Sequence, residues 1–82
     1  MKLPRDVSGS VLAKALRRYG YEVTRQAGSH MRLTTRLRGT DHHVTIPAHK
    51  TLAPGTLSAV VRDVAYYLGV DRDAIVRELF GP

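Results

Sequence analysis

The stretch from His30 to Leu37 constrains the fold more than any other part of the chain, because its residues alternate in character. The odd positions are mainly apolar and the even positions are polar or basic: Met31, Leu33, Thr35 and Leu37 against His30, Arg32, Thr34 and Arg36. Successive side chains of a strand point to opposite faces of the sheet. The stretch therefore predicts a strand with one face in the core and the other exposed and basic.

A strand is also predicted before this stretch, over residues 21–26. Alternation there assigns three side chains to each face: Tyr21, Val23 and Arg25 to one, Glu22, Thr24 and Gln26 to the other. Gly28 and Ser29 then join the two strands as a hairpin turn. His30 is expected to project from the first position after this turn.

A third strand is predicted after a turn at residues 38–41, where Gly39 can adopt a positive φ. Val44 and Ile46 must point inward for their side chains to be buried. Pro47 has no N–H to donate to a neighbouring strand, so the third strand is an edge strand or ends there.

The length of that turn sets which residues face each other. With a two-residue loop, Leu33 opposes Ile46 and His30 opposes His49. A register shift of two residues would leave the two histidines as diagonal neighbours on the same face, because the side-chain period of a strand is two. Both registers predict that His30 and His49 lie close together.

Helices are predicted before and after the strands. Three apolar patterns have helical spacing: Val11, Leu12, Ala15, Leu16 and Tyr19; Leu57, Val60, Val61, Val64 and Leu68; and Ile75, Val76, Leu79 and Phe80. The first helix is expected to be capped by Ser8 or Ser10 and to end at Gly20. The second is expected to be capped by Thr56 and to end at Gly69, and the third to be capped by Asp71. The order αβββα plus a short C-terminal helix predicts an α+β fold. Its helices cover one face of a three-stranded antiparallel sheet, in a single domain spanning residues 1–82.

Charge is unevenly distributed along the 82 residues. Residues 14–50 contain eight basic and two acidic residues, whereas residues 51–82 contain three basic and four acidic ones. A one-sided positive field indicates a phosphate-bearing partner such as RNA. The candidate RNA contacts are the basic residues of the first helix, the sheet and its end: Lys14, Arg17, Arg18, Arg25, Arg32, Arg36 and Lys50.

Several kinds of site and location are disfavoured. The chain has no cysteine, which excludes disulfides and thiolate zinc sites. No apolar run reaches the ~20 residues of a membrane span, and no signal peptide is recognisable, so a cytoplasmic protein without a membrane partner is expected. Alternation sends His42 and His43 to opposite faces, so they cannot converge with His30 and His49 on one metal ion. No metal or other cofactor is therefore predicted.

His30 is the candidate catalytic residue on chemical grounds. An imidazole can take up and release a proton near neutral pH, as cleavage of a phosphodiester by its own 2′-hydroxyl requires. Arg32 or Arg36 beside it could hold the phosphate. The residues alone leave three alternatives open: a surface histidine without function, a non-catalytic RNA-binding module, and a small protein-interaction domain.

Four segments in order are more specific: LRRYGY at 16–21, RQAGSH at 25–30, VTIPAH at 44–49 and GTL at 55–57. Together they resemble the HicA-type mRNA interferase toxins, the YcfA-like family. The resemblance implies a double-stranded-RNA-binding-like αβββα fold and an endoribonuclease that cleaves mRNA and is inhibited by a HicB-type antitoxin. It also implies that His30 is catalytic and that Gly28 and Ser29 position it. His49 matches the histidine of a Pro-x-His motif, either as a second catalytic group or as a neighbour that shapes the site.

Overall fold

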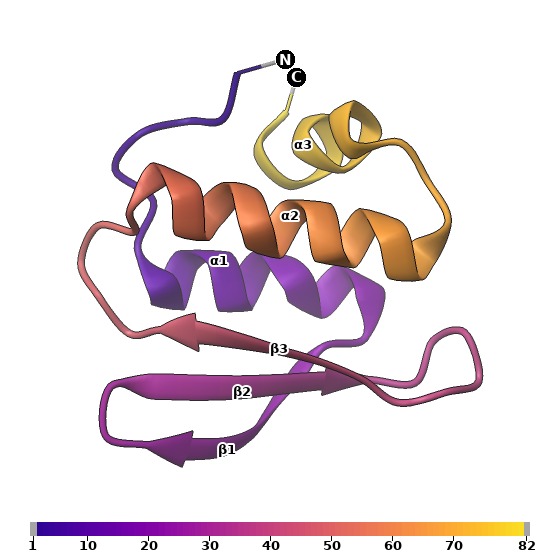
Figure 1. The fold of residues 1–82 in the computed structure, drawn as a ribbon, viewed down its shortest axis with the longest axis horizontal. Coiled ribbons are helices and arrows are strands. Elements are labelled where there is room, and N and C mark those ends of the chain that lie inside the picture. Colours follow the sequence, from indigo (N-terminus) through magenta and orange to yellow (C-terminus); the bar gives the residue numbers. More distant parts are fainter. Residues whose placement is uncertain (1, 82) are drawn as a thin grey trace.

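Three antiparallel strands form one sheet, and helices cover one of its faces (Figure 1). The computed structural model describes residues 2–81, so Met1 and Pro82 of the predicted span lie outside the described residues. In chain order the elements are α1 (Gly9–Ala15), the 3-10 helix η1 (Leu16–Tyr19), β1 (Glu22–Ala27), β2 (His30–Thr35), β3 (His42–Pro47), α2 (Pro54–Leu68) and α3 (Arg72–Phe80). The predicted α+β fold, αβββα followed by a terminal helix, is confirmed.

The first helix begins and ends at the predicted residues. Ser8 is its N-cap, and the Ser8 hydroxyl accepts a hydrogen bond from the Val11 N–H at 3.0 Å. After α1 the chain tightens into η1, which ends at Gly20 in the left-handed conformation with φ 82°. Leu12 of α1 and Leu16 of η1 are completely buried, whereas Val11, predicted in the same stripe, is exposed.

The second helix starts earlier than predicted. The expected cap was Thr56, but α2 begins at Pro54, whose φ already suits a helix and whose missing N–H would have no partner in the first turn. Gly69 ends α2 with φ 70°, and the Asp71 carboxylate caps α3 by accepting from the Asp73 N–H. No helix within residues 2–81 is long and apolar enough to cross a membrane.

β2 has the two faces that its alternation predicts: buried Met31, Leu33 and Thr35 against exposed His30 and Arg32. Thr35 can be buried because its hydroxyl donates to the carbonyl oxygen of Tyr19 at 2.7 Å. Leu37, also predicted on the buried face, is 59% exposed. That part of the prediction is wrong because the strand ends at Thr35.

The observed pairing of β2 with β3 is shifted by two residues from the pairing predicted with a two-residue loop. The predicted pairs are wrong: His30 lies opposite Pro47 instead of His49, and Leu33 lies opposite Val44 instead of Ile46. Since the shift is even, every side chain of β3 keeps its predicted face. β3 ends at Pro47 and lies at one edge of the sheet, as predicted.

The register shift follows from a longer loop, which occupies residues 36–41. A tyrosine of α2 holds this loop. The Tyr67 hydroxyl accepts from the Arg38 N–H at 2.8 Å and donates to the Thr40 carbonyl oxygen at 2.7 Å. Gly39, between these two residues, has the predicted positive φ, at 87°. The contact with α2 therefore decides where β3 begins.

β1 contains an irregularity that its alternation does not predict. Val23 pairs with Leu33 but Arg25 pairs with Arg32, so Thr24 is an extra residue in β1. Thr24 keeps the face predicted for it, beside Thr34, but the faces predicted for Arg25 and Gln26 are wrong. Arg25 lies on the same face of the sheet as Arg32, the face turned away from the helices.

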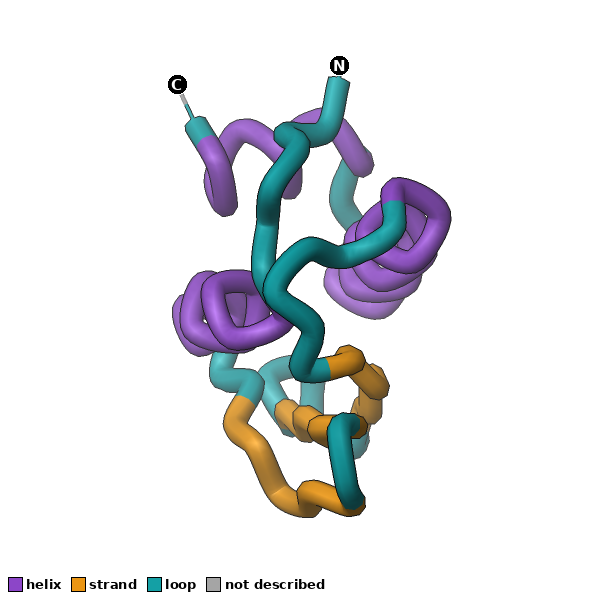
Figure 2. The backbone as a smooth tube through the Cα atoms, turned by 90° about the vertical axis from the view of Figure 1, so that its left-hand side faces the viewer, coloured by secondary structure: helices purple, strands orange, loops and turns teal. Residues whose placement is uncertain are grey.

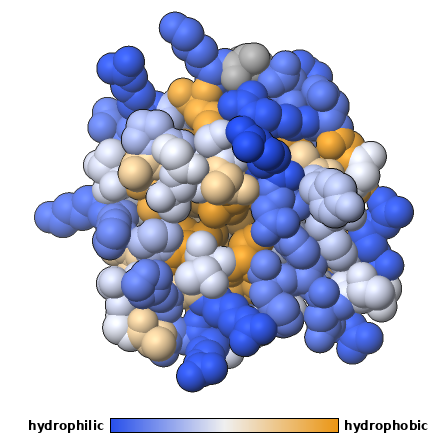
Figure 3. Space-filling model, viewed as in Figure 1, coloured by the Kyte–Doolittle hydropathy of each residue, from blue (hydrophilic) through white to orange (hydrophobic). Residues whose placement is uncertain are grey.

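The molecule has its strands at one end, α1 and α2 in the middle, and α3 beyond them (Figure 2). β1 lies farthest from the helices (Figure 1), and all its residues are exposed. Tyr21, just before β1, is fully buried. In Figure 3 hydrophobic side chains gather in the middle of the view, surrounded by hydrophilic ones. The buried core lies between α1, α2 and the inner face of β2 and β3, and it extends to α3 through Ile75 and Val76.

Candidate functional site

A two-residue turn presents His30 to solvent. Ala27 pairs with His30, so Gly28 and Ser29 form the turn, and Gly28 has a φ of 57° at its first position. A positive φ at that position is typical of a type II′ hairpin turn. The His30 side chain is exposed and makes no hydrogen bond with any residue from 2 to 81. Its imidazole is therefore available to a ligand.

The end of β3 is tied to this turn. The Ala48 N–H donates to the Ser29 carbonyl oxygen at 2.5 Å, and the His49 carbonyl oxygen accepts from the Gly9 N–H at 2.9 Å. His49 is exposed and lies two residues beyond the residue that pairs with His30. The structure thus joins the backbone segments that carry the two histidines, and it places His49 at the junction with α1.

Two of the predicted arginines lie near His30 on the open face, the face of the sheet turned away from the helices. Arg32 follows His30 by two residues in β2, and Arg25 pairs with Arg32 across the sheet. Arg36 does not lie beside His30: it is six residues away, about 20 Å along the chain direction. Its Nε lies 3.0 Å from Oδ1 of Asp41. Arg32 is therefore the predicted cation that neighbours His30.

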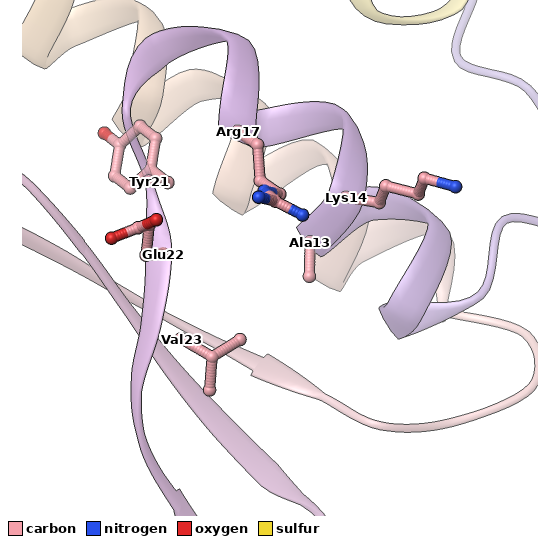
Figure 4. A pocket seen from close by; sticks show the side chains of 6 residues that line it. All are labelled: Ala13, Lys14, Arg17, Tyr21, Glu22 and Val23. Atoms are coloured by element: carbon pink, nitrogen blue, oxygen red, sulfur yellow. The ribbon is translucent and has the colours of Figure 1, made fainter.

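A groove of about 560 Å³ lies between the first helical segment and β1, lined by Ala13, Lys14, Arg17, Tyr21, Glu22 and Val23 (Figure 4). Lys14 and Arg17 project from the helical side, and Val23 points toward them from the strand. The Glu22 carboxylate points away from the helix. The groove thus combines an apolar surface with two cationic side chains.

Other basic residues stabilise the fold. The Arg18 guanidinium, predicted to contact RNA, donates to the carbonyl oxygen of Glu78 in α3. The Arg38 guanidinium donates to the Leu68 carbonyl oxygen at 2.7 Å, at the end of α2. Both satisfy carbonyl groups near a helix C-terminus, where a cation is favoured. Lys50, in contrast, is exposed in the segment that follows β3.

His42 links β3 to α2 and to the residue just before β1, and the sequence assigned it no role. Its Nδ1 lies 2.6 Å from the Tyr21 hydroxyl oxygen and its Nε2 lies 3.1 Å from Asp63 Oδ1. The ring stacks on Tyr67 with centroids 4.5 Å apart. His42 and His43 face opposite sides of the sheet, as predicted. Within residues 2–81 no group of three His, Cys, Asp or Glu side chains could hold a metal ion.

Residues 9–65 match the family model described as "HicA toxin of bacterial toxin-antitoxin". The chain belongs to the HicA toxin family. It is thus the toxin of a toxin-antitoxin system, which implies an antitoxin partner. No curated protein and no solved structure matches this HicA-family toxin.

Burial of two tyrosines predicts that this HicA-family toxin loses stability in alkali. Burial raises the pKa of Tyr21, and the charge of Asp63 raises it further; burial and the hydrogen bond to Glu78 raise the pKa of Tyr19. Below pH 10 both tyrosines are protonated in the folded and the unfolded chain. Above pH 10 only the unfolded chain releases these protons, so the free energy of unfolding falls as pH rises.

The measurement is the urea midpoint at pH 8 and pH 10.5. Tyr21→Phe should cost about 1–2 kcal/mol at pH 8, because Nδ1 of His42 loses its hydrogen-bond partner, but should lose less stability in alkali than wild type. Tyr66→Phe is the matched control, because Tyr66 is 88% exposed. An equal alkaline loss in wild type and Tyr21→Phe would contradict the role of Tyr21.

Proposed function

We propose that this toxin is an endoribonuclease that cleaves mRNA in the cytoplasm without a metal ion, with His30 as general acid or general base. The observation that carries the proposal is the position of His30. Its imidazole is exposed directly after a tight turn, on the open face that also bears Arg32 and Arg25. Membership of the HicA toxin family supports a toxic activity, and the resemblance of the four segments supports RNA as the substrate.

The proposed reaction needs proton transfer and charge stabilisation. A base removes the proton of a ribose 2′-hydroxyl, and the 2′-oxygen attacks the adjacent phosphorus. The bond from phosphorus to the 5′-oxygen breaks, and that oxygen takes up a proton. His30 can serve in either proton transfer. The guanidinium groups of Arg32 and Arg25 can bind the phosphate oxygens and stabilise the charge that develops on them. The products are a 2′,3′-cyclic phosphate and a 5′-hydroxyl.

Further phosphate groups of the RNA would bind outside the open face. Lys14 and Arg17 flank the groove beside β1, and Lys50 lies one residue beyond His49. Arg36 is exposed just after the end of β2, where a phosphate could replace the Asp41 carboxylate as the partner of its guanidinium. Arg18 is the least available of the predicted contacts, because it is bonded to α3. Contacts of this kind give RNA affinity that falls with rising salt.

The antitoxin is proposed to be a HicB-type protein that covers the open face. Inhibition is most direct where the partner excludes RNA from His30. The open face suits this role, because its side chains lie outside the core and no helix within residues 2–81 covers them. Arg32→Glu reverses a charge at its centre, so it should weaken the binding of both RNA and antitoxin.

Cleavage of labelled RNA by the purified toxin tests the proposal. We expect RNA to be shortened to products with 2′,3′-cyclic phosphate ends, equally with and without a chelator, and DNA of the same sequence to stay intact. RNA that is bound with a steep salt dependence but never shortened would instead indicate a non-catalytic RNA-binding module. Loss of cleavage in the chelator would contradict the metal-free mechanism.

A further inference from the structure

A chain of hydroxyl groups crosses the open face and ends at a second histidine, His43. The Thr34 hydroxyl oxygen lies 2.7 Å from Nδ1 of His43 and 2.8 Å from the Thr24 hydroxyl oxygen. The Thr24 hydroxyl in turn donates to the carbonyl oxygen of Arg32 at 3.3 Å. Each strand supplies one of these side chains, and Thr24 is the extra residue of β1.

These three hydrogen bonds can form together in only one direction. The Arg32 carbonyl oxygen has no proton, so the Thr24 hydroxyl donates to it and cannot also donate to Thr34. The Thr34 hydroxyl must then donate to Thr24. The remaining contact is made by the Nδ1–H of His43, which donates to Thr34. Each hydroxyl group thereby donates once and accepts once.

The direction of the bonds decides which nitrogen of the neutral His43 ring carries the proton. With the proton on Nδ1, the other nitrogen, Nε2, has a free lone pair. His43 is exposed, and its Nε2 has no hydrogen-bond partner within residues 2–81. His43 therefore presents a hydrogen-bond acceptor on a face whose arginines can only donate.

We infer that Nε2 of His43 accepts a hydrogen bond from bound RNA, from either a ribose 2′-hydroxyl or a base amino group. Both groups are donors that single-stranded RNA exposes. The inference rests on the proposed function for its ligand, because His43 shares the open face with His30. Arg32 binds phosphate oxygens and His43 binds a donor, so the two side chains select different groups of the same strand.

His43 acts at a different nucleotide from His30. It pairs with Thr34, which is four residues from His30 in β2, about 13 Å along the strand. A catalytic acid or base must come within about 3 Å of the reacting oxygen. His43 is therefore a residue for RNA affinity and selectivity, and Thr34 is a positioning residue that acts through it.

The protonated nitrogen of His43 can be measured without RNA. In long-range ¹H–¹⁵N spectra recorded above pH 8, wild-type His43 should show a protonated Nδ1 and an unprotonated Nε2. Thr34→Val removes the acceptor of the Nδ1 proton, so it should shift the ring toward the other tautomer. A wild-type ring with its proton on Nε2 would overturn the inference, whatever the toxin does to RNA.

RNA binding is measured in a His30→Ala background, in which the proposed reaction is slowed, and intact RNA recovered after each titration shows that binding is read apart from cleavage. His43→Phe should weaken binding about fivefold to tenfold, the effect of one hydrogen bond. His43→Gln should retain most of the affinity, because its amide oxygen can replace Nε2 as acceptor. Binding by His43→Phe within twofold of its parent would overturn the inference.

Modified RNAs identify the donor. Oligonucleotides with one 2′-deoxy nucleotide, or with one base that lacks its amino group, are compared for the parent and for His43→Phe. The RNA modification that removes the donor should weaken RNA binding by the parent about fivefold to tenfold and leave RNA binding by His43→Phe unchanged. If every substitution affects both proteins equally, His43 accepts no hydrogen bond from RNA. Cleavage by wild type reports separately on the proposed function.

Discussion

Replacement of His30 by alanine should lower kcat for RNA cleavage by about 10²–10⁴-fold, the usual effect of losing a general acid or base. It should also abolish growth arrest when the toxin is expressed without an antitoxin. KM should change little, because Arg25 and Arg32 remain to bind the phosphate. The assay is the initial rate of cleavage of a labelled RNA across a range of RNA concentrations.

The structure makes this substitution easy to interpret. The His30 side chain is exposed and makes no hydrogen bond within residues 2–81, so the melting temperature should not change. His49→Gln is the companion variant. A fall in kcat as large as that of His30→Ala would make His49 a second catalytic group, and a smaller change would leave it as a residue that shapes the site. Equal toxicity of wild type and His30→Ala would contradict the proposed mechanism.

Gly9→Ala should destabilise the fold by about 2–4 kcal/mol, a large part of the ~5–15 kcal/mol of a typical domain. A Cβ atom at Gly9 would lie 2.0 Å from the Pro47 carbonyl oxygen and 3.1 Å from the Ala48 Cα. Both are backbone atoms, so α1 would have to move away from the end of β3. The movement would also stretch the hydrogen bond from the Gly9 N–H to the His49 carbonyl oxygen.

Gly55→Ala is the matched control for Gly9→Ala. Gly55 also lies in the first turn of a helix, α2, but a Cβ atom there would have no neighbour within 4 Å. Alanine is favoured over glycine in a helix by about 0.5–1 kcal/mol, so this variant should be unchanged or slightly more stable. Urea unfolding of both variants measures the difference. A Gly9→Ala protein as stable as wild type would show that α1 and β3 can separate at little cost.

The features that were predicted correctly depend on residues close together in the chain. Ser8 caps α1 because its hydroxyl reaches an N–H three residues later, and Gly20 and Gly69 end helices because glycine tolerates a positive φ. Thr56 was the exception. Pro54 and Thr56 both suit a helix start, and the start lies at the proline.

The features that were missed depend on contacts between distant residues. The start of β3 follows from the two hydrogen bonds that the Tyr67 hydroxyl makes with the loop before it. In the chain, Tyr67 is separated from that loop by all of β3 and most of α2. His42 likewise meets Tyr21 and Asp63, which are each 21 residues away. No local pattern signals such pairs, because each residue taken alone has several possible partners.

The sequence by itself determined which side of the sheet His30 occupies. Side chains of a strand alternate with a period of two, so the error of two residues in the register left every face of β2 and β3 unchanged. The same alternation placed Arg32 beside His30, and only the tertiary structure decided which of the other arginines lie on that face. One extra residue at Thr24 turns Arg25 to the open face, and the end of β2 at Thr35 removes Arg36 from it. These outcomes depend on pairing between strands, which a single strand's pattern does not contain.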